Sequence, residues 1–484
     1  MDKQTLIRLV RNAGALLASD ITTRVSVYVI YALVARRLGT QDFGRLSLGL
    51  TLLYSFQMLA SAGVKTLLTR EIAKDRSQTR AYMRNGLLLV VGMSLVSIAA
   101  MSLLGYALQY PPETCLILVL LSLSLLPISI SVVFEAVFTG WERMHYVMFA
   151  NAPINVLRIG LIVAVLTLGI GLPGVVLAMF ASAVVLVGVE GILVRRSLPP
   201  MATPDKAHDA MTTLTSLKKL GQQSFTFVGI DFVIAAAASI NYLVISKLAN
   251  EANLGLFNAA TQIISPITML VQTLAVSLLP ALSRQVQTNL AGVSRSAAQL
   301  LRMKLTFMLP LVIGLFYLCE PAFRLLYGRP EFVAASPLLR IIIWGNLCVV
   351  FTSVLGQTLV AGMREHQVLK LVLVIAAIEV TLNALLVSWL GVLGAAITML
   401  VVRVAYVVPH IHFARAMLPG LSIAEAIKRP VVAALGMGLA LTVAHAAGIN
   451  AFVAFGISGV VFLGLLGLLH IDTVKRGLRH FAVP

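Results

Sequence analysis

The sequence has few charged residues for a chain of 484 residues. Asp, Glu, Lys and Arg make up 12% of it, against the share of about 25% that is typical of soluble domains. Hydrophobic residues make up 59%, and the mean hydropathy is +0.95. Such a composition excludes an ordinary soluble protein and indicates an integral membrane protein with many spans.

Cysteine is also scarce, and the usual catalytic motifs are missing. The three cysteines are Cys115, Cys319 and Cys348, which lie in or beside apolar segments without CxxC or histidine spacing. We therefore predict packing roles for them, with neither a disulfide nor a metal site. The sequence has no Gly-rich phosphate loop, no zinc-spaced histidines, no nucleophile elbow and no soluble segment large enough for a sugar nucleotide. An ATP-driven pump or a glycosyltransferase would need one of these, so we predict no catalytic residues, no cofactor and no enzymatic activity.

Acidic residues are half as frequent as basic ones: 19 against 37, which gives a formal net charge of +18. A basic chain can bind nucleic acid, but in a membrane protein the same excess is expected from the positive-inside bias of cytoplasmic loops, which is the interpretation that we favour. The first apolar region runs past Asp20 and Arg24 without a convincing cleavage site. It therefore predicts a first span and not a cleaved signal peptide.

Apolar segments separated by turn signals predict an all-α chain with about 14 transmembrane helices. The predicted spans are 12–35, 43–65, 85–108, 114–138, 146–169, 172–194, 221–247, 254–281, 303–323, 334–361, 368–390, 392–414, 430–447 and 450–470. Most Lys and Arg residues between them fall on one side when the N-terminus is placed in the cytoplasm. Both termini are then predicted to be cytoplasmic.

The second half of the chain repeats the first. Three connecting segments of the first half resemble segments of the second half, and each pair joins corresponding spans: 37–46 resembles 247–257, 139–147 resembles 361–369, and 169–178 resembles 391–398. We predict two parallel six-helix lobes, an architecture of transporters that bind substrate between the lobes. The predicted domains are an N-lobe at 1–194, a cytoplasmic linker at 195–220, a C-lobe at 221–416, and two extra spans with a cytoplasmic tail at 417–484.

A specific family pattern lies between residues 38 and 76. The turn "LGTQDFG" begins it, an apolar span follows, and "GVKTLLTREIAK" ends it with basic residues. In this order, and this close to the N-terminus, the pattern resembles the start of Wzx-type polysaccharide and O-antigen flippases of the multidrug/oligosaccharidyl-lipid/polysaccharide exporter superfamily. The resemblance covers roughly residues 10–415 well and the last two spans loosely.

The resemblance implies a flippase of a bacterial inner membrane. Its substrate would be a polyprenyl-pyrophosphate-linked oligosaccharide, moved from the cytoplasmic to the outer leaflet by alternating access for surface polysaccharide biosynthesis. Other glycan-assembly membrane proteins would be its partners. A multidrug exporter of the same superfamily and a membrane-embedded glycan polymerase or ligase are the alternatives. A multidrug exporter would need an acidic cavity for cationic drugs, whereas the three central arginines and three central acids leave no negative excess. The two parallel repeats and the lack of a large outer loop argue against a polymerase or ligase.

Three arginines are predicted at mid-membrane depth, namely Arg24, Arg158 and Arg403. A charge at this depth costs about 2.5–3.5 kcal/mol on insertion scales, so it should be paired or face a watery cavity. Arg24 can pair with Asp20 on the same helix face, and the other two can pair internally, for instance with Glu379. The functional alternative is a cationic cavity for a lipid pyrophosphate, which the planar guanidinium binds at two points.

Two further groups of residues are candidates. Lys65 and Arg70 lie at the predicted cytoplasmic mouth of the second span, where they would serve as topology anchors or as a first contact for a headgroup. Asp20, Asp231 and Glu379 lie inside spans and are candidate coupling residues, whether a proton or a sodium gradient drives transport.

The orientation predicts which loops are exposed on each side of the membrane. In a cysteine-free background, a membrane-impermeant thiol reagent should label Glu331→Cys and not Asp205→Cys in cells with a permeabilised outer membrane. Labelling of the cysteine at position 205 in intact inner membranes would contradict the orientation.

Overall fold

The chain forms helices throughout the parts that are described. The computed structural model describes residues 3–61, 63–197, 235–276, 290–361, 365–418 and 420–481, and within these ranges it is all-α. The chain divides into two compact units, Met1–Gly255 and Leu256–Pro484. Ten helices are long and apolar enough to cross a membrane, or 11 if one bent pair counts as a single span. These counts apply to the described ranges, and the predicted spans 221–247 and 254–281 extend beyond them.

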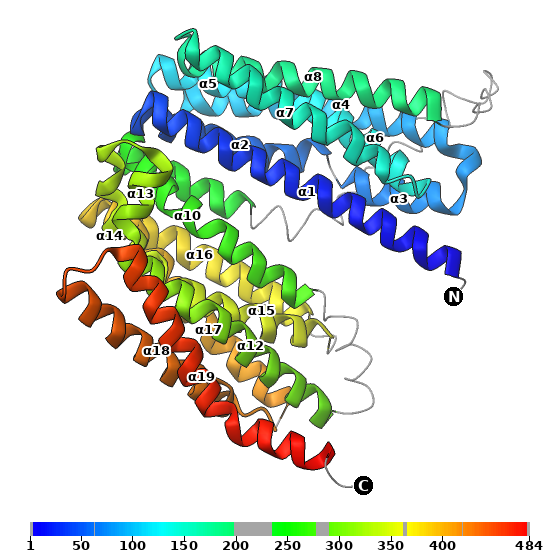
Figure 1. The fold of residues 1–484 in the computed structure, drawn as a ribbon. Helices are drawn as coiled ribbons and strands as arrows, with labels where there is room; N and C mark the ends of the chain where they lie inside the picture. Colours follow the sequence, from blue (N-terminus) through cyan, green and yellow to red (C-terminus); the bar gives the residue numbers. More distant parts are fainter. Residues whose placement is uncertain are drawn as a thin grey trace, which may run out of the picture. The chain divides into compact units, whose positions relative to one another are not determined.

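The first unit is built on apolar helices that pack side by side. Its described helices are α1 (Lys3–Leu38), α2 (Thr40–Ser61), α3 (Val64–Lys74), α4 (Thr79–Ala107), α5 (Pro112–Leu123), α6 (Leu125–Gly140), α7 (His145–Thr167), α8 (Gly171–Ser197) and the shorter helix Ala235–Leu248. Helix α7 packs against α1 and α8, and α6 packs against α3, α4 and α8. In Figure 1, α3 lies at the same end of this unit as the C-terminal ends of α6 and α8.

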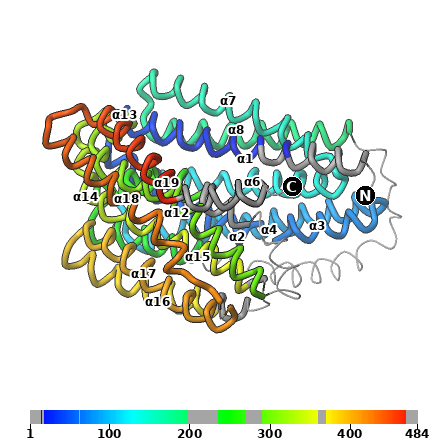
Figure 2. Tube along the Cα trace, turned by 60° about the horizontal axis from the view of Figure 1, so that its bottom comes forward, coloured from blue at the N-terminus to red at the C-terminus, as the bar shows by residue number. Residues whose placement is uncertain are grey.

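The second unit contains the remaining helices. They are most of α10 (Glu251–Val276), then α12 (Leu290–Tyr317), α13 (Cys319–Tyr327), α14 (Ser336–Ile342), α15 (Gly345–Ala361), α16 (Glu365–Leu390), α17 (Val392–Met417), α18 (Ile423–Ala446) and α19 (Ala451–Phe481). Helix α17 packs against α15 and α16, and α18 packs against α12 and α19 (Figure 2).

Several predicted spans differ from the observed helices. The predicted second span, 43–65, lies within the candidate span Thr40–Lys74, in which Gly63 adopts a left-handed conformation (φ 69°) between α2 and α3. The span at 114–138 consists of α5 and α6, and the span at 334–361 is the pair α14 and α15, bent by 45°. The predicted start at 303 is wrong, because α12 begins at Leu290: polar residues continue the helix beyond the apolar stretch that hydropathy detects.

Two glycines allow an unusually close helix crossing within the first unit. Thr40 and Glu251 are the first residues of α2 and α10, and Gly44 and Gly255 lie one turn further along each helix. A Cβ on Gly44 would lie 1.8 Å from the carbonyl oxygen of Glu251, and a Cβ on Gly255 would lie 2.1 Å from that of Thr40. The two contacts are reciprocal, and they join the turn segments 37–46 and 247–257 that the sequence relates as repeats.

This crossing should not tolerate a methyl group. Gly44→Ala should lower the free energy of unfolding by about 1–3 kcal/mol, since the obstacle is backbone and cannot rotate away. The matched control is Gly92→Ala on α4, where nothing lies within 4 Å of the added Cβ. Thermal unfolding in detergent measures both variants, and equal stability of the two would contradict the close contact.

Candidate functional site

The central feature of α1 is an ion pair in the middle of the helix. The Arg24 Nε donates to the Asp20 Oδ2 at 2.8 Å, one helical turn away. The side chains of Arg24 and Asp20 are 49% and 50% exposed. The pair is therefore formed without being enclosed by the protein, so its remaining hydrogen-bonding groups are available to water or a ligand.

Helix α7 places a second arginine near the same part of the first unit. The Asn155 Nδ2 donates to the Thr23 Oγ1 at 3.0 Å and so joins α7 to the residue next to Arg24. Arg158 follows one turn later on α7 and is half-buried, and its Nε donates to the Ser182 Oγ on α8 at 2.8 Å. The two arginines thus lie on neighbouring turns of packed helices, but each guanidinium group has its own partner.

In the second unit, Arg403 on α17 has polar partners from two other helices. Its Nη1 lies 3.4 Å from the Asn346 Oδ1 on α15, and that oxygen also accepts a 2.6 Å hydrogen bond from Thr268. The charge of Glu379 on α16 acts on the Arg403 guanidinium. Asp231, the third candidate acid, lies outside the described residues.

Lys65 and Arg70 lie on α3, which is the last part of the candidate span Thr40–Lys74. Lys65 forms an ion pair with Glu135 on α6, and Arg70 forms one with its neighbour Glu71. Both basic side chains are about half exposed. The anchor interpretation and the alternative of headgroup contact both stay predictions.

Some charged groups were not predicted from the sequence to have a role inside the protein. Arg45 contacts Glu251 at 2.7 Å and Asp42 at 3.2 Å, with Arg45 and Glu251 only 15% and 10% exposed. Lys304 is 1% exposed and donates to Ser353 at 3.1 Å. Glu190 is fully buried. Its place near the end of the predicted span 172–194 concealed its depth, because α8 continues to Ser197.

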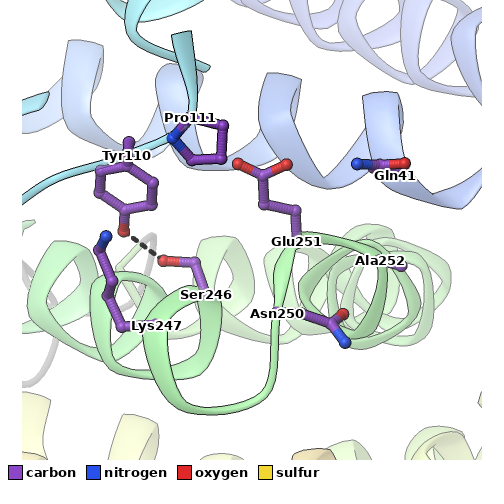
Figure 3. A pocket seen from close by; sticks show the side chains of 8 residues that line it. All are labelled: Gln41, Tyr110, Pro111, Ser246, Lys247, Asn250, Glu251 and Ala252. Carbon is purple, nitrogen blue, oxygen red and sulfur yellow. Dashed lines mark hydrogen bonds between the residues drawn. The ribbon is translucent and has the colours of Figure 1, made fainter. Parts of the chain in front are cut away.

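A cavity of about 500 Å³ lies beside the Arg45–Glu251 pair (Figure 3). Its lining residues are Gln41, Tyr110, Pro111, Ser246, Lys247, Asn250, Glu251 and Ala252. The Lys247 Nζ lies 3.7 Å from the centroid of the Tyr110 ring, and the Tyr110 hydroxyl is 2.5 Å from the Ser246 Oγ. Burial raises the pKa of Tyr110 to about 12, so this hydroxyl stays protonated and its hydrogen bond holds the interhelical turn at 108–111 to the helix Ala235–Leu248.

The described residues contain guanidinium groups on α1, α7 and α17 but no cluster of three or more metal-ligating side chains. Half-exposed guanidinium and carboxylate groups within apolar helices bind polar ligands and exchange charge partners. They supply no nucleophile with an adjacent base.

Solved structures with the same architecture are transporters and flippases. The chain is similar to a lipid II flippase MurJ in an inward closed conformation, with a TM-score of 0.71 and 14% identity over 94% of this chain and 98% of that one. A multidrug resistance MATE family transporter of the MOP superfamily, in an inward-facing conformation, matches with a TM-score of 0.62 and 14% identity over 84% and 98% of the two chains. A MOP superfamily transporter from Pyrococcus furiosus matches with a TM-score of 0.54 and 15% identity over 84% and 96%. These matches define the fold as that of the MOP flippases and transporters.

The family follows from the sequence. The model of the polysaccharide biosynthesis protein family matches residues 9–286, more than half of the chain, and the chain belongs to this family. No curated protein matches it. The resemblance found between residues 38 and 76 is thereby confirmed, and the chain is a multi-pass membrane protein.

The buried Arg45–Glu251 pair should be structural. Glu251→Ala leaves Arg45 with weaker partners in a mostly buried position and should cost about 3–5 kcal/mol of unfolding free energy. The control is Glu331→Ala, which removes an ion pair with Arg329 whose side chains are 39% and 44% exposed and should cost at most about 1 kcal/mol. Denaturation of the purified variants in detergent measures both losses of unfolding free energy. A loss for Glu251→Ala no larger than that for Glu331→Ala would refute the structural role of the pair.

Proposed function

We propose that the chain is a flippase that moves a polyprenyl-pyrophosphate-linked oligosaccharide from the cytoplasmic to the outer leaflet of a bacterial inner membrane, with both termini in the cytoplasm. Family membership supports a role in polysaccharide biosynthesis, and the fold is shared with a lipid II flippase. The observation that carries the proposal is the half-exposed Asp20–Arg24 pair in the middle of α1, within the first span that the sequence predicts.

The argument from this pair is energetic. At the depth that the sequence predicts for this pair, hydrocarbon would not accept two half-exposed charged side chains, because each carries hydrogen-bonding groups that lipid cannot satisfy. The pair must therefore face a polar cavity. In such a cavity the Arg24 guanidinium can exchange Asp20 for a pyrophosphate, to which it donates two parallel hydrogen bonds.

The substrate and the direction of transport can be tested in cells. Disruption of the gene should make the lipid-linked oligosaccharide accumulate with its sugars on the cytoplasmic face of the inner membrane. An unchanged distribution of this glycan, together with lost resistance to cationic drugs, would favour the multidrug exporter instead. Loss of polymer with unpolymerised glycan on the outer face would favour a polymerase or ligase.

The role of Arg24 can be separated from a structural one. In the double variant Asp20→Asn with Arg24→Leu, glycan export should fall about 10- to 100-fold, the equivalent of one lost charge-assisted hydrogen bond. Arg24→Lys should restore export only in part, because the ammonium group lacks the planar fork.

The matched control for the double variant is Arg76→Leu with Glu142→Gln. It removes an ion pair whose side chains, Arg76 and Glu142, are 46% and 66% exposed. The two residues lie in the segments 75–78 and 141–144, which connect α3 to α4 and α6 to α7. Export should remain near normal in this control. A well-expressed Asp20→Asn, Arg24→Leu variant that exports normally would remove Arg24 from the site.

A further inference from the structure

Glu190 is a carboxylic acid in the interior of the first unit. It lies on the inner stripe of α8, between Leu186 and Val194, and its side chain is 0% exposed. Val194, one turn further along α8, belongs to an apolar core shared with α3, α4 and α6, and Leu193 and Phe134 pack against that core. About two helical turns separate Glu190 from Ser197, the last residue of α8.

The surroundings of Glu190 do not compensate an ionised carboxylate. Ser131 on α6 lies within its reach, but among the described residues neither carboxyl oxygen has a hydrogen bond of acceptable geometry. An ion in such a place costs several kcal/mol, whereas a neutral carboxyl costs far less. This geometry therefore favours the protonated form.

The charged groups that act on Glu190 are Glu135 and Lys65. The Glu135 carboxylate is engaged on both oxygens, by the Lys65 Nζ and by the Asn151 Nδ2. The exposed fraction falls stepwise along this series, from 48% for Lys65 to 17% for Glu135 and 0% for Glu190. The series leads from solvent to the buried acid at the end of the unit where α3, α6 and α8 meet (Figure 1).

Among the residues whose side chains are described, the other helices packed against α8 bring no further opposite charge to Glu190. On α7, Arg158 is bonded to Ser182, two turns away on α8, and His145 packs against Tyr146 and Phe149. On α1, Arg24 is paired with Asp20. The one charged residue of α5 is Glu113, in its first turn.

We propose that Glu190 is a proton-binding site of the first unit, protonated in this conformation, and that it exchanges its proton with solvent past the Glu135–Lys65 ion pair. On release the carboxyl O–H bond breaks, its electron pair stays on the oxygen, and the proton passes to water at the end of α8. The positive charge of the Lys65 ammonium then stabilises the ionised carboxylate of Glu190. A metal cation fits this place less well, because Glu135 already has its oxygens engaged and the Lys65 charge would repel the ion. Use of this site to drive transport rests on the proposed function, whereas the protonation itself does not.

Infrared difference spectroscopy of the purified protein in nanodiscs tests the site without requiring transport. The wild type should show the carbonyl band of a protonated carboxyl group at neutral pH, Glu190→Gln should lack that band, and alkaline pH should remove it from the wild type. Glu113→Gln, which alters an exposed acid in the same unit (67% exposed), should leave the band and its pH dependence unchanged. Identical spectra for wild type and Glu190→Gln at neutral pH would overturn the proposal.

A second variant tests the path. Glu135→Gln removes the neighbouring negative charge and frees Lys65 to compensate Glu190, so the band should disappear at a proton concentration about tenfold higher than in the wild type. An unchanged midpoint would overturn the role of the Glu135–Lys65 pair. Because the assay uses no glycan, a failure here leaves the proposed substrate standing, and a failed flipping assay leaves the proton site standing.

Discussion

The hydrocarbon core of a membrane accepts a charged side chain only if that side chain is paired, reaches water, or becomes neutral. The first unit contains an example of each solution. Arg45 and Glu251 are paired and mostly buried, Asp20 and Arg24 are paired but half exposed, and Glu190 is buried without a hydrogen-bond partner among the described residues. These differences in burial distinguish the Arg45–Glu251 pair from the Asp20–Arg24 pair, for which we propose binding, and from Glu190, for which we propose proton exchange.

The buried Arg45–Glu251 pair lies where the first turns of α2 and α10 cross. Glycines bring the two backbones together, and the Arg45–Glu251 pair lies beside them. Thr114 adds a hydrogen bond to the same Glu251 carboxylate, and Ser55 on α2 accepts or donates at 2.7 Å with Ser239 further along the interface. Polar contacts of this kind hold helices together where lipid provides no hydrophobic driving force.

Hydropathy, turn residues and the pattern between residues 38 and 76 were sufficient to predict the all-α membrane fold and the family. They could not predict the break at Gly63 or the division of 114–138 into α5 and α6, because an apolar run has the same composition whether or not the helix is interrupted. The start of α12 at Leu290 was missed for the opposite reason, since its first turns are polar.

The candidate site was predictable in part. Helical spacing alone indicated the Asp20–Arg24 pair, which the structure contains, because residues four apart share one helix face. Spacing could not indicate the partners of Arg158 and Arg403, which come from other helices at Ser182 and Asn346. The burial of Glu190 and Lys304 likewise depends on tertiary packing.

Reconstitution tests the central claim most directly. Purified protein is placed in liposomes whose inner leaflet carries a polyprenyl-pyrophosphate oligosaccharide, and the sugars that reach the outer surface are measured with a lectin. The account predicts transfer by the wild type and by the Arg76→Leu, Glu142→Gln control, with little transfer by the Asp20→Asn, Arg24→Leu variant. Equal transfer by all three proteins would contradict it, as would no transfer by a folded wild type with an intact substrate.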